Sequence, residues 1–264
     1  MKDNTIQSIK GFKDILPNEV KYYKYIENTI FNISQQYAIN EIRLPIIEKS
    51  ELFMKSIGNN TDIVNKEMYD FIDKNGNSIC LRPEGTASVV RSVIEHNLVY
   101  DRGLKKQKYM YYGPMFRHEK PQKGRYRQFN QFGIEYFGFI DTNSDLELIT
   151  LGNHMFDKLG LDNAELHINS LGNIDDKQKY GKIVSQYFTP LRNTLDEYQL
   201  KTLSNNPLRL LDSKKDNIKD TLKKIPKMNE TLSDDSKKNI LRDAMKFYAE
   251  EIKIQLSFND SHDI

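Results

Sequence analysis

Hydrophobic side chains recur every three or four positions in two stretches of the chain. The first stretch begins after Pro17 and ends near Gln36, and its apolar positions are Tyr22, Tyr25, Ile26, Ile30 and Ile33. The second stretch extends from Asp145 to Leu159. This spacing places the apolar side chains along one side of an α-helix. Both stretches are therefore predicted to be amphipathic helices, and the first is expected to pack on a sheet.

Shorter runs, at 42–47, 68–73, 78–81 and 164–168, have the composition of β-strands. Asn75-Gly76 separates the second run from the third and predicts a tight turn, because glycine readily adopts the positive φ that such a turn needs. Pro45 interrupts the first run and cannot donate to a sheet ladder, which places that run at a sheet edge or an interface. A helix is predicted to follow from Thr86, with four residues facing inward: Val89, Val90, Val93 and Ile94.

The stretch from Tyr109 to Phe139 predicts a β-hairpin, because two aromatic-rich runs flank a basic segment that contains proline and glycine. Alternation along the second strand gives it a core face, formed by Phe132, Ile134 and Tyr136. The opposite face carries Phe129, Gln131, Gly133 and Glu135. There the missing side chain of the glycine leaves room for something else to lie on the sheet. Glu135 is interpreted as functional, since an acid between apolar neighbours has no packing value.

The predicted hairpin tip is strongly basic. Around the single acid Glu119 it carries Arg117, Lys120, Lys123, Arg125 and Arg127. The whole chain has a net charge of only +2, so this local patch alone indicates binding of phosphates or nucleic acid. An ordinary amphipathic hairpin with a solvated, charged tip is the alternative.

The composition limits the class of protein. The chain has 264 residues, of which 38% are hydrophobic, and can bury a core. It shows neither a membrane-spanning run nor a signal peptide, so we expect a soluble, cytoplasmic protein with no membrane partner. The single cysteine, Cys80, excludes an internal disulfide framework and is expected to be a small buried hydrophobe. The five histidines lack metal-ligand spacing and no P-loop is present, so no protein-held metal is expected, and ATP, if used, is held in another way.

The composition changes after Leu171. Residues 175–256 are rich in lysine, aspartate and asparagine, with helical runs separated by Pro190, Pro207 and Pro226 and a further run from Lys237 to Ile252. These runs predict a set of short helices. From the charges alone, a solvated helical appendage without a ligand is nearly as well supported as a functional insertion.

Three of these segments resemble histidyl-tRNA synthetases, which are class II aminoacyl-tRNA synthetases. Phe116-Arg117-His118-Glu119, followed by the run from Gly124 to Glu135, is similar to motif 2 in its histidine-specific form. The run from Ile42 to Ile47 is similar to motif 1, the dimer element, with Pro45 at its marker position. Arg82-Pro83-Glu84-Gly85-Thr86 is similar to the segment that holds the α-amino group of histidine. On that last segment, the alternative is that Thr86 is only an N-cap and Glu84 only favours the helix dipole.

The resemblance implies an α+β fold, with a class II antiparallel sheet flanked by helices and a helical insertion. It divides the chain into a catalytic core at 1–170, the insertion at 171–255 and an end at 256–264. It further implies a histidine-tRNA ligase, which activates histidine with ATP to histidyl-adenylate and transfers it to histidine tRNA. Mg²⁺ is implied by the use of ATP, and a homodimer by Pro45.

The resemblance also assigns roles to individual residues. Arg117 is the catalytic residue and would bind the α-phosphate of ATP and the carboxylate of histidine. Glu119, Phe129 and Arg125 would bind the adenine amino group, the adenine ring and the outer phosphates.

Histidine would be held by Glu84, Thr86, Gln131 and Glu135, with Glu135 accepting from a ring N–H. The acceptor end of the tRNA would meet the hairpin tip at Gln122, Lys123 and Arg125.

The similarity extends from about Ile9 to Phe258. In the family the chain continues into a second signature, Leu-Val-Arg-Gly-Leu-Asp-Tyr-Tyr, and then into motif 3 and an anticodon-binding domain, where this sequence has Ser261 to Ile264. We therefore expect an incomplete sheet and a chain that is inactive, or nearly so, and poorly stable by itself. Two other functions stay open: a non-catalytic regulatory subunit of ATP phosphoribosyltransferase, and a plain tRNA-binding module.

Overall fold

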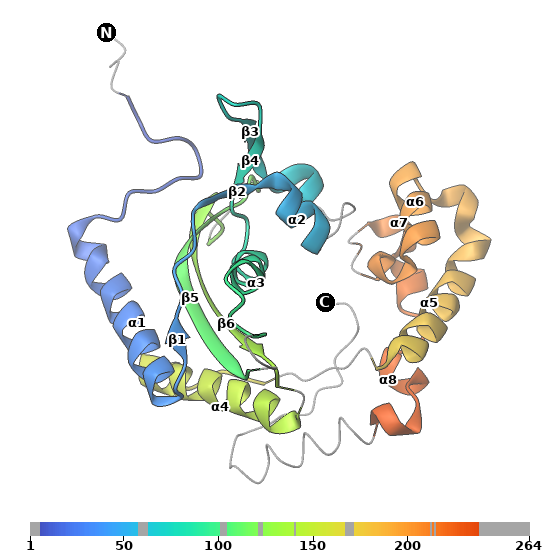
Figure 1. Cartoon of the computed structure of the whole chain (residues 1–264). Coiled ribbons are helices and arrows are strands. Elements are labelled where there is room, and N and C mark those ends of the chain that lie inside the picture. The colour runs from blue at the N-terminus through green and yellow to red at the C-terminus, as the bar shows by residue number, and fades with distance from the viewer. Residues whose placement is uncertain are drawn as a thin grey trace. The chain divides into compact units, whose positions relative to one another are not determined.

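The computed structural model describes residues 6–57, 63–100, 105–120, 124–139, 141–166, 172–211, 213 and 215–237. The chain divides into two compact units, Met1–Leu161 and Asp162–Ile264. The first unit is a mixed α+β structure and the second is helical (Figure 1).

A three-stranded sheet forms the centre of the first unit. It consists of β1 (Asn40–Glu41), β5 (Gln107–Phe116) and β6 (Gln128–Phe137), in the order β1-β5-β6 (Figure 1). β1 is parallel to β5, and β5 pairs with β6 in an antiparallel register that sets Tyr111 opposite Gly133. The predicted β-hairpin is confirmed.

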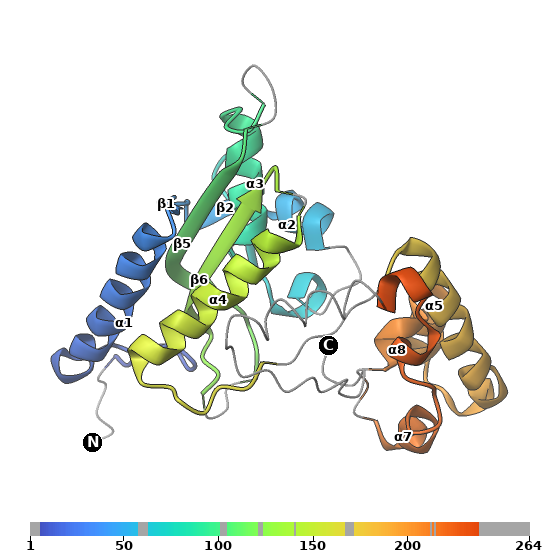
Figure 2. The ribbon, with the colours of Figure 1, turned by 90° about the horizontal axis from the view of Figure 1, so that it is seen from below.

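Two long helices cover one face of this sheet (Figures 1 and 2). They are α1 (Pro17–Gln36) and α4 (Thr142–Leu159), both predicted from their periodicity. Proline at the first position suits α1, because the first N–H groups of a helix have no partner within the helix. The core here is formed by Ile30, Ile33, Ile39, Met110, Leu151 and Met155, and Phe132, Ile134 and Tyr136 pack against it. The predicted core face of the hairpin is therefore confirmed.

The opposite face packs on α3 (Thr86–Glu95). Val89 and Val93 are buried there against Tyr111 and Met115. The predicted inward orientation of Val90 and Ile94 is wrong, because Val90 is 38% exposed and Ile94 is 67% exposed. A helix with about 3.6 residues per turn buries one stripe of side chains against a sheet, and these two residues lie on the next stripe.

A second small sheet has the order β2-β4-β3 and consists of β2 (Ile47–Lys49), β4 (Ser78–Leu81) and β3 (Tyr69–Ile72). The two predicted strands around the Asn-Gly pair are confirmed. In their turn, Gly76 has φ +82°, and the Asp73 carboxylate accepts hydrogen bonds from the backbone N–H groups of Asn75 and Asn77. The remaining elements of this unit are α2 (Ser50–Ile57) and a π-helical turn (Ile63–Glu67).

The predicted strand at 42–47 is wrong for most of its length. β1 ends at Glu41 and β2 begins at Ile47, so residues 42–46 belong to no strand. Pro45 has no N–H to donate, and the carbonyl groups of Leu44 and Pro45 accept hydrogen bonds from the side chain of Arg82 instead of from a strand. Single backbone hydrogen bonds hold the two ends of the segment, from Ile42 N to Met110 O at 2.8 Å and from Arg82 N to Ile46 O at 2.9 Å, and the Arg82 side chain holds its middle.

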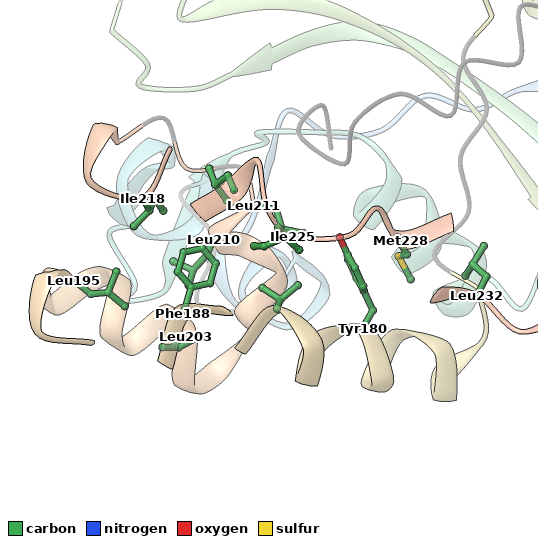
Figure 3. Packing of buried hydrophobic residues seen from close by; sticks show 12 residues of the cluster. Tyr180, Phe188, Leu195, Leu203, Leu210, Leu211, Ile218, Ile225, Met228 and Leu232 are labelled. Atoms are coloured by element: carbon green, nitrogen blue, oxygen red, sulfur yellow. The ribbon is translucent and has the colours of Figure 1, made fainter. Parts of the chain in front are cut away.

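The second unit consists of short helices connected by tight turns. It contains α5 (Ile174–Phe188), a 3₁₀ turn (Thr189–Thr194), α6 (Glu197–Asn205), a second 3₁₀ turn (Pro207–Leu210), α7 (Asp216–Leu222) and α8 (Met228–Thr231). Figure 3 shows the shared core, which includes Tyr180, Phe188, Leu203, Leu210 and Ile218. The predicted short helices separated by prolines are therefore present. Of the run predicted from Lys237 to Ile252, only Lys237 lies within the described residues.

Asp176, in the first turn of α5, is a buried acid with four hydrogen bonds. Its carboxylate accepts from Ser236 Oγ at 2.6 Å, from Ser233 N at 2.8 Å, from Ser233 Oγ at 3.1 Å and from Asn173 N at 3.2 Å. These bonds lower the pKa of Asp176 from its ordinary 3.8 to about 2, and the bond from Ser236 has the largest effect. The charged carboxylate therefore fastens the start of α5 to the segment at 233–236.

The predicted strand at 164–168 is not seen where it can be checked. Leu166 forms an isolated bridge, the two residues before it are irregular, and 167 and 168 lie outside the described residues. Among the helices that the structure describes, none has the length and hydrophobicity to cross a membrane.

Candidate active site

Three of the predicted histidine-binding residues meet where the loop after β4 enters α3. Thr86 Oγ1 donates a hydrogen bond to Glu135 Oε1 at 2.6 Å, and Gly85 N donates to Gln131 Oε1 at 3.1 Å. Gln131 and Glu135 lie on the same face of β6, two residues to either side of Gly133, as the alternation predicted. The structure thus brings together residues that are more than 40 positions apart in the sequence.

Glu84 caps the helix that begins beside it. Its carboxylate accepts from Thr86 N at 2.6 Å and from Ala87 N at 3.0 Å, which satisfies two of the backbone donors at the start of α3. The alternative in which Thr86 is only an N-cap is wrong, because the Thr86 side chain bonds to Glu135 rather than to its own helix. Glu84, for which the alternative was a dipole interaction alone, bonds directly to the N–H groups of the helix start. These two bonds leave the Glu84 carboxylate able to accept further hydrogen bonds, because a carboxylate has about four acceptor positions.

The Glu135 carboxyl is half-buried. Burial raises its pKa, the hydrogen bond from Thr86 lowers it, and the nearby charge of Glu84 raises it again, with a net upward shift. Two carboxylates close together in a partly desolvated place favour a ligand that brings N–H donors or positive charge. An α-amino group and an imidazole N–H are donors of this kind.

The space over Gly133 is not open. Sequence alternation predicted room for a ligand there, but the ring of Tyr111 from β5 fills it, and only 4% of that residue is exposed. A Cβ atom on Gly133 would lie 2.3 Å from Tyr111 Cζ, and one on Gly85 would lie 2.2 Å from Tyr111 Cε2. The ring is therefore wedged between β6 and the start of α3. Sequence reasoning missed Tyr111, although its position opposite a glycine in the hairpin register is a signal that points to it.

Sequence reasoning also missed the structural role of Arg82. It is 5% exposed, and its Nε donates to Pro114 O at 2.9 Å while Nη1 donates to Leu44 O at 2.9 Å. A Cβ atom on Gly113 would lie 2.6 Å from Arg82 Nη2, so the guanidinium lies against the sheet. Burial lowers the pKa of Arg82. The side chain joins the segment around Pro45 to β5.

The residues predicted to bind ATP lie at the end of the hairpin. Arg117 Nε donates to Pro83 O at 2.9 Å, and its guanidinium carbon is 5.2 Å from the centroid of the Phe129 ring. Arg125 Nη1 lies 3.1 Å from Glu119 Oε2, and the Arg125 side chain is 62% exposed. The structure therefore pairs Arg117 with Phe129 and Arg125 with Glu119. The tRNA predictions for residues 122 and 123 fall outside the described residues.

The segment near the N-terminus holds the base of the hairpin tip. Arg127 N donates to Gly11 O at 2.8 Å, and Arg127 Nη1 donates to Lys10 O at 3.3 Å. Gly11 has φ +92°, and a Cβ atom there would lie 2.7 Å from Arg127 Cγ, so both its backbone and the close approach require glycine. Phe12 packs its ring near Phe116, at 6.5 Å between centroids.

An apolar groove of about 780 Å³ lies beside the predicted dimer residue Pro45. Leu52, Val90 and Ile94 contribute to its walls, and charged residues, among them Glu48 and Arg91, surround them. Ile46 and Ile47, the residues that follow Pro45, are exposed as well.

Cys80 is fully buried, as expected, and burial raises the pKa of its thiol to about 11. No group of three or more histidine, cysteine or acidic side chains suited to a metal ion occurs in the part of the chain that the structure describes.

Comparison with known proteins places the chain in one family. The family model for histidyl-tRNA synthetase matches residues 11–262. The chain is 47% identical over 235 residues to the histidine–tRNA ligase of Legionella pneumophila (strain Lens) and 48% identical over 234 residues to that of Hydrogenovibrio crunogenus. Each match covers 89% of this chain and 54% of the relative, so the chain spans about half the length of these curated relatives.

Solved structures give the same result. Apo histidyl-tRNA synthetase of S. aureus superposes with a TM-score of 0.77 at 31% identity, over 97% of this chain and 57% of that one. A Bacillus halodurans protein, described as an ATP phosphoribosyltransferase regulatory subunit/histidyl-tRNA synthetase, superposes with a TM-score of 0.63 at 19% identity, which shows a shared fold alone. On the match of the family model to nearly the whole sequence, the chain belongs to the histidyl-tRNA synthetase family.

Proposed function

We propose that this site binds L-histidine and ATP and serves the activation step of a histidine–tRNA ligase. The observation that carries the proposal is the hydrogen bond between Thr86 and Glu135 at the entrance to α3, with Gln131 beside it. A half-buried carboxylate at this position is a suitable acceptor for a ring N–H of histidine, which supports the proposal. The curated relatives named histidine–tRNA ligase support the same reading.

Glu135 supplies the selectivity in this proposal. An amino acid with an apolar side chain offers no N–H donor to this half-buried carboxylate. Its binding free energy is therefore less favourable, because a buried acceptor loses water without gaining a hydrogen bond. Glu84 and Thr86 are proposed to hold the α-amino group, and Gln131 to contact the bound amino acid. The four residues come from β6 and from the junction before α3, so β-hairpin and helix together form the pocket.

Activation requires that two anions, the histidine carboxylate and the α-phosphate of ATP, meet. Arg117 is the proposed catalytic residue, because a guanidinium can bind both and can stabilise charge that develops on the phosphate oxygens. Its bond to Pro83 O fixes the guanidinium one residue before Glu84, next to the proposed amino-acid pocket. Carboxylate attack on the α-phosphorus then displaces pyrophosphate and leaves histidyl-adenylate.

ATP is proposed to lie along the end of the hairpin, with adenine on Phe129, its amino group at Glu119 and the outer phosphates at Arg125. Arg125 and Glu119 form an ion pair in which the Arg125 side chain is 62% exposed and the Glu119 side chain 20% exposed. Ion pairs at the surface contribute about 0–1 kcal/mol, so ATP can separate this pair at small cost. Mg²⁺ would arrive with the phosphates of ATP, since the described residues provide no acidic cluster of their own for a metal.

Transfer to tRNA is the second half of the proposal. Gln122, Lys123 and Arg125 at the basic tip are proposed to contact the acceptor end of histidine tRNA. The division into a catalytic core at 1–170, an insertion at 171–255 and an end at 256–264 is likewise proposed, with the helical insertion leaning on the acceptor arm. The protein is proposed to work in the cytoplasm.

A homodimer is proposed to form around Pro45. The exposed residues Ile46 and Ile47 adjoin it, and the groove of about 780 Å³ exposes Val90 and Ile94, giving apolar surface of the kind that subunit contacts cover.

The alternative is a regulatory subunit of ATP phosphoribosyltransferase, whose fold is compatible with this chain. The presence of Arg117, Gln131 and Glu135 together with the basic tip favours the ligase, because a regulator has no need of tRNA contacts. Histidine binding that is indifferent to added tRNA would favour the regulator. Salt-sensitive tRNA binding without any dependence on histidine would instead indicate a plain tRNA-binding module.

The activity is best tested with the unmatched part of a relative supplied, since this chain spans about half of the curated relatives. The chain is mixed with the separately expressed remainder of the Legionella ligase, and exchange of labelled pyrophosphate into ATP is measured with and without L-histidine. We expect histidine-dependent exchange that Arg117→Ala reduces by about 10²-fold or more. Exchange that is independent of histidine, or unaffected by Arg117→Ala, would contradict the proposal.

A further inference from the structure

Arg82 directly follows β4 and is held between two other parts of the chain. Its backbone N–H donates to Ile46 O at 2.9 Å, and its carbonyl accepts from Phe116 N at 3.0 Å. Its side chain donates to carbonyl groups on the same two sides, at residues 44–45 and at Pro114. Backbone and side chain together therefore fix the place where the chain leaves β4 for the loop before α3.

The next residue carries the acceptor for the proposed catalytic arginine. Arg117 Nε donates to the carbonyl oxygen of Pro83 at 2.9 Å, and Pro83 is buried. A guanidinium has five N–H donors, so this bond leaves the four on Nη1 and Nη2 for anions. The position of the Pro83 carbonyl therefore sets the direction in which the Arg117 guanidinium points.

We propose that Arg82 is a positioning residue for Arg117, which acts through the carbonyl of Pro83. The peptide bond is planar and the proline ring fixes φ, so only ψ of Pro83 can turn between the carbonyl of Arg82 and that of Pro83. A displacement of Arg82 is therefore passed on to the acceptor of Arg117. The role of Arg82 in catalysis rests on the proposed function of Arg117, but the contacts between these residues do not.

Gly113 offers a way to displace the Arg82 guanidinium without removing it. A Cβ atom on Gly113 would lie 2.6 Å from Arg82 Nη2 and 3.9 Å from Arg82 Cζ, and apart from chain neighbours no other described atom lies within 4 Å. Gly113→Ala must therefore push the end of this side chain aside, while its charge stays. Arg82→Met removes the donors altogether. Because methionine has no Nη2 atom, Gly113→Ala should have little further effect in the Arg82→Met chain.

A loss of stability alone must be separated from a loss of position. Leu151→Ala is the matched control, because Leu151 is 2% exposed and packs from α4 on the opposite face of the sheet. Removing a buried leucine side chain destabilises a protein as removing the Arg82 bonds should. Leu151→Ala should therefore lower the melting temperature but leave Arg117 in place.

The bond from Arg117 to Pro83 can be followed without any ligand. In the 264-residue chain labelled with nitrogen-15 arginine, NMR measures the exchange of the Arg117 Nε proton with water, and Arg117→Lys identifies the signal by its loss. A hydrogen-bonded N–H exchanges slowly, because the bond must open first.

We expect this exchange to become about tenfold faster in Gly113→Ala and in Arg82→Met, and to stay unchanged in Leu151→Ala. If Arg82→Met does not fold, Gly113→Ala alone decides. An unaltered exchange rate in Gly113→Ala would overturn the proposal, and so would an equal acceleration in Leu151→Ala.

Exchange of pyrophosphate into ATP, with the remainder of the Legionella ligase supplied, is the second measurement. In Gly113→Ala, kcat should fall about tenfold with a much smaller change in KM for L-histidine, because Arg117 is proposed to act on charge that develops in the transition state. An unchanged kcat would overturn the role of Arg82 in catalysis. Faster proton exchange in Gly113→Ala, together with no histidine-dependent activity in the unaltered chain, would establish the positioning of Arg117 and refute the proposed function.

Discussion

At the scale of single residues, the site depends on side chains that hold backbone segments together rather than on exposed groups. Arg82 is the clearest case, because its buried guanidinium donates to carbonyl groups of Leu44 and Pro114, from two separate parts of the chain. Removing the donor leaves these part-buried carbonyl groups without that partner, and an unsatisfied buried group costs about 1–3 kcal/mol.

Arg82→Met should therefore lower the free energy of unfolding of the first unit by about 3 kcal/mol. Arg43→Met is the matched control, since the Arg43 side chain is 84% exposed and its pairing with Glu41 is a surface ion pair. Urea denaturation followed by circular dichroism compares the two variants. Equal stability of the two would show that the Arg82 bonds contribute nothing.

Gly133 and Gly152 allow a second comparison at this scale. Gly133→Ala should destabilise the first unit by about 1–3 kcal/mol, because the new Cβ atom would overlap the Tyr111 ring. Gly152→Ala, in α4, should stabilise it by about 0.4–1 kcal/mol by restricting the unfolded chain, because beyond the local helix backbone and the chain neighbours nothing described lies within 4 Å of the new Cβ. Thermal melting of both variants checks the opposite signs, and a shift in the same direction for both would contradict the wedge.

At the scale of elements, periodicity and turn residues correctly predicted the helices, turn and strands that depend on local sequence. Helices α1 and α4, the turn at Gly76 and the two strands of the hairpin follow from spacing and turn chemistry, and all are present. The strand expected at 42–47 is missing between 42 and 46, where the carbonyl groups of Leu44 and Pro45 bond to the side chain of Arg82, which lies far along the sequence. Val90 and Ile94 were misplaced because hydrophobicity alone cannot tell a second apolar stripe facing solvent from one facing a core.

The candidate site was predictable in part for the same reason. Gln131 and Glu135 were found because they share a strand face, and Thr86 because it belongs to a recognisable segment. The partner of Thr86 was not predictable from sequence, because a threonine at a helix start can also cap its own helix and tertiary packing decides between the two bonds. The occupant of the space over Gly133 depended on the hairpin register, which sequence leaves open within a residue or two.

The start of α5 gives a prediction for pH. The pKa of Asp176 is about 2 in the folded state and 3.8 ordinarily, so the charged form is favoured by folding. Its stabilisation is complete above pH 3.8 and is lost as the pH falls toward about 2. The free energy of unfolding should therefore fall more steeply over this window in the unaltered chain than in Asp176→Asn, which cannot ionise.

Asp175→Asn is the control for that experiment, since Asp175 is the exposed neighbour on the same turn. It should keep the pH slope of the unaltered chain in urea denaturation from pH 5 to about 2. A slope unchanged by Asp176→Asn would show that the hydrogen bonds from Ser233 and Ser236 do not favour the charged form.

At the scale of the whole molecule, the chain matches the histidyl-tRNA synthetase family along nearly its entire length and spans about half the length of its curated relatives. The proposed homodimer is the property at this scale that follows from the surface. Light scattering after gel filtration should give a dimer, and Ile94→Asp, which puts a charge beside the groove, should give a monomer that is still folded. If the unaltered chain is a monomer, the groove is not a contact between subunits.

Recognition of histidine by the proposed pocket around Glu135 can be measured without the rest of the reaction, by titrating L-histidine into this chain in a calorimeter. We expect one saturable site, and an affinity that falls about 10- to 100-fold in Glu135→Gln, because a hydrogen bond to a charged acceptor is replaced by one to a neutral amide. Histidine binding that is equally tight in Glu135→Gln, or absent from the unaltered chain, would contradict it.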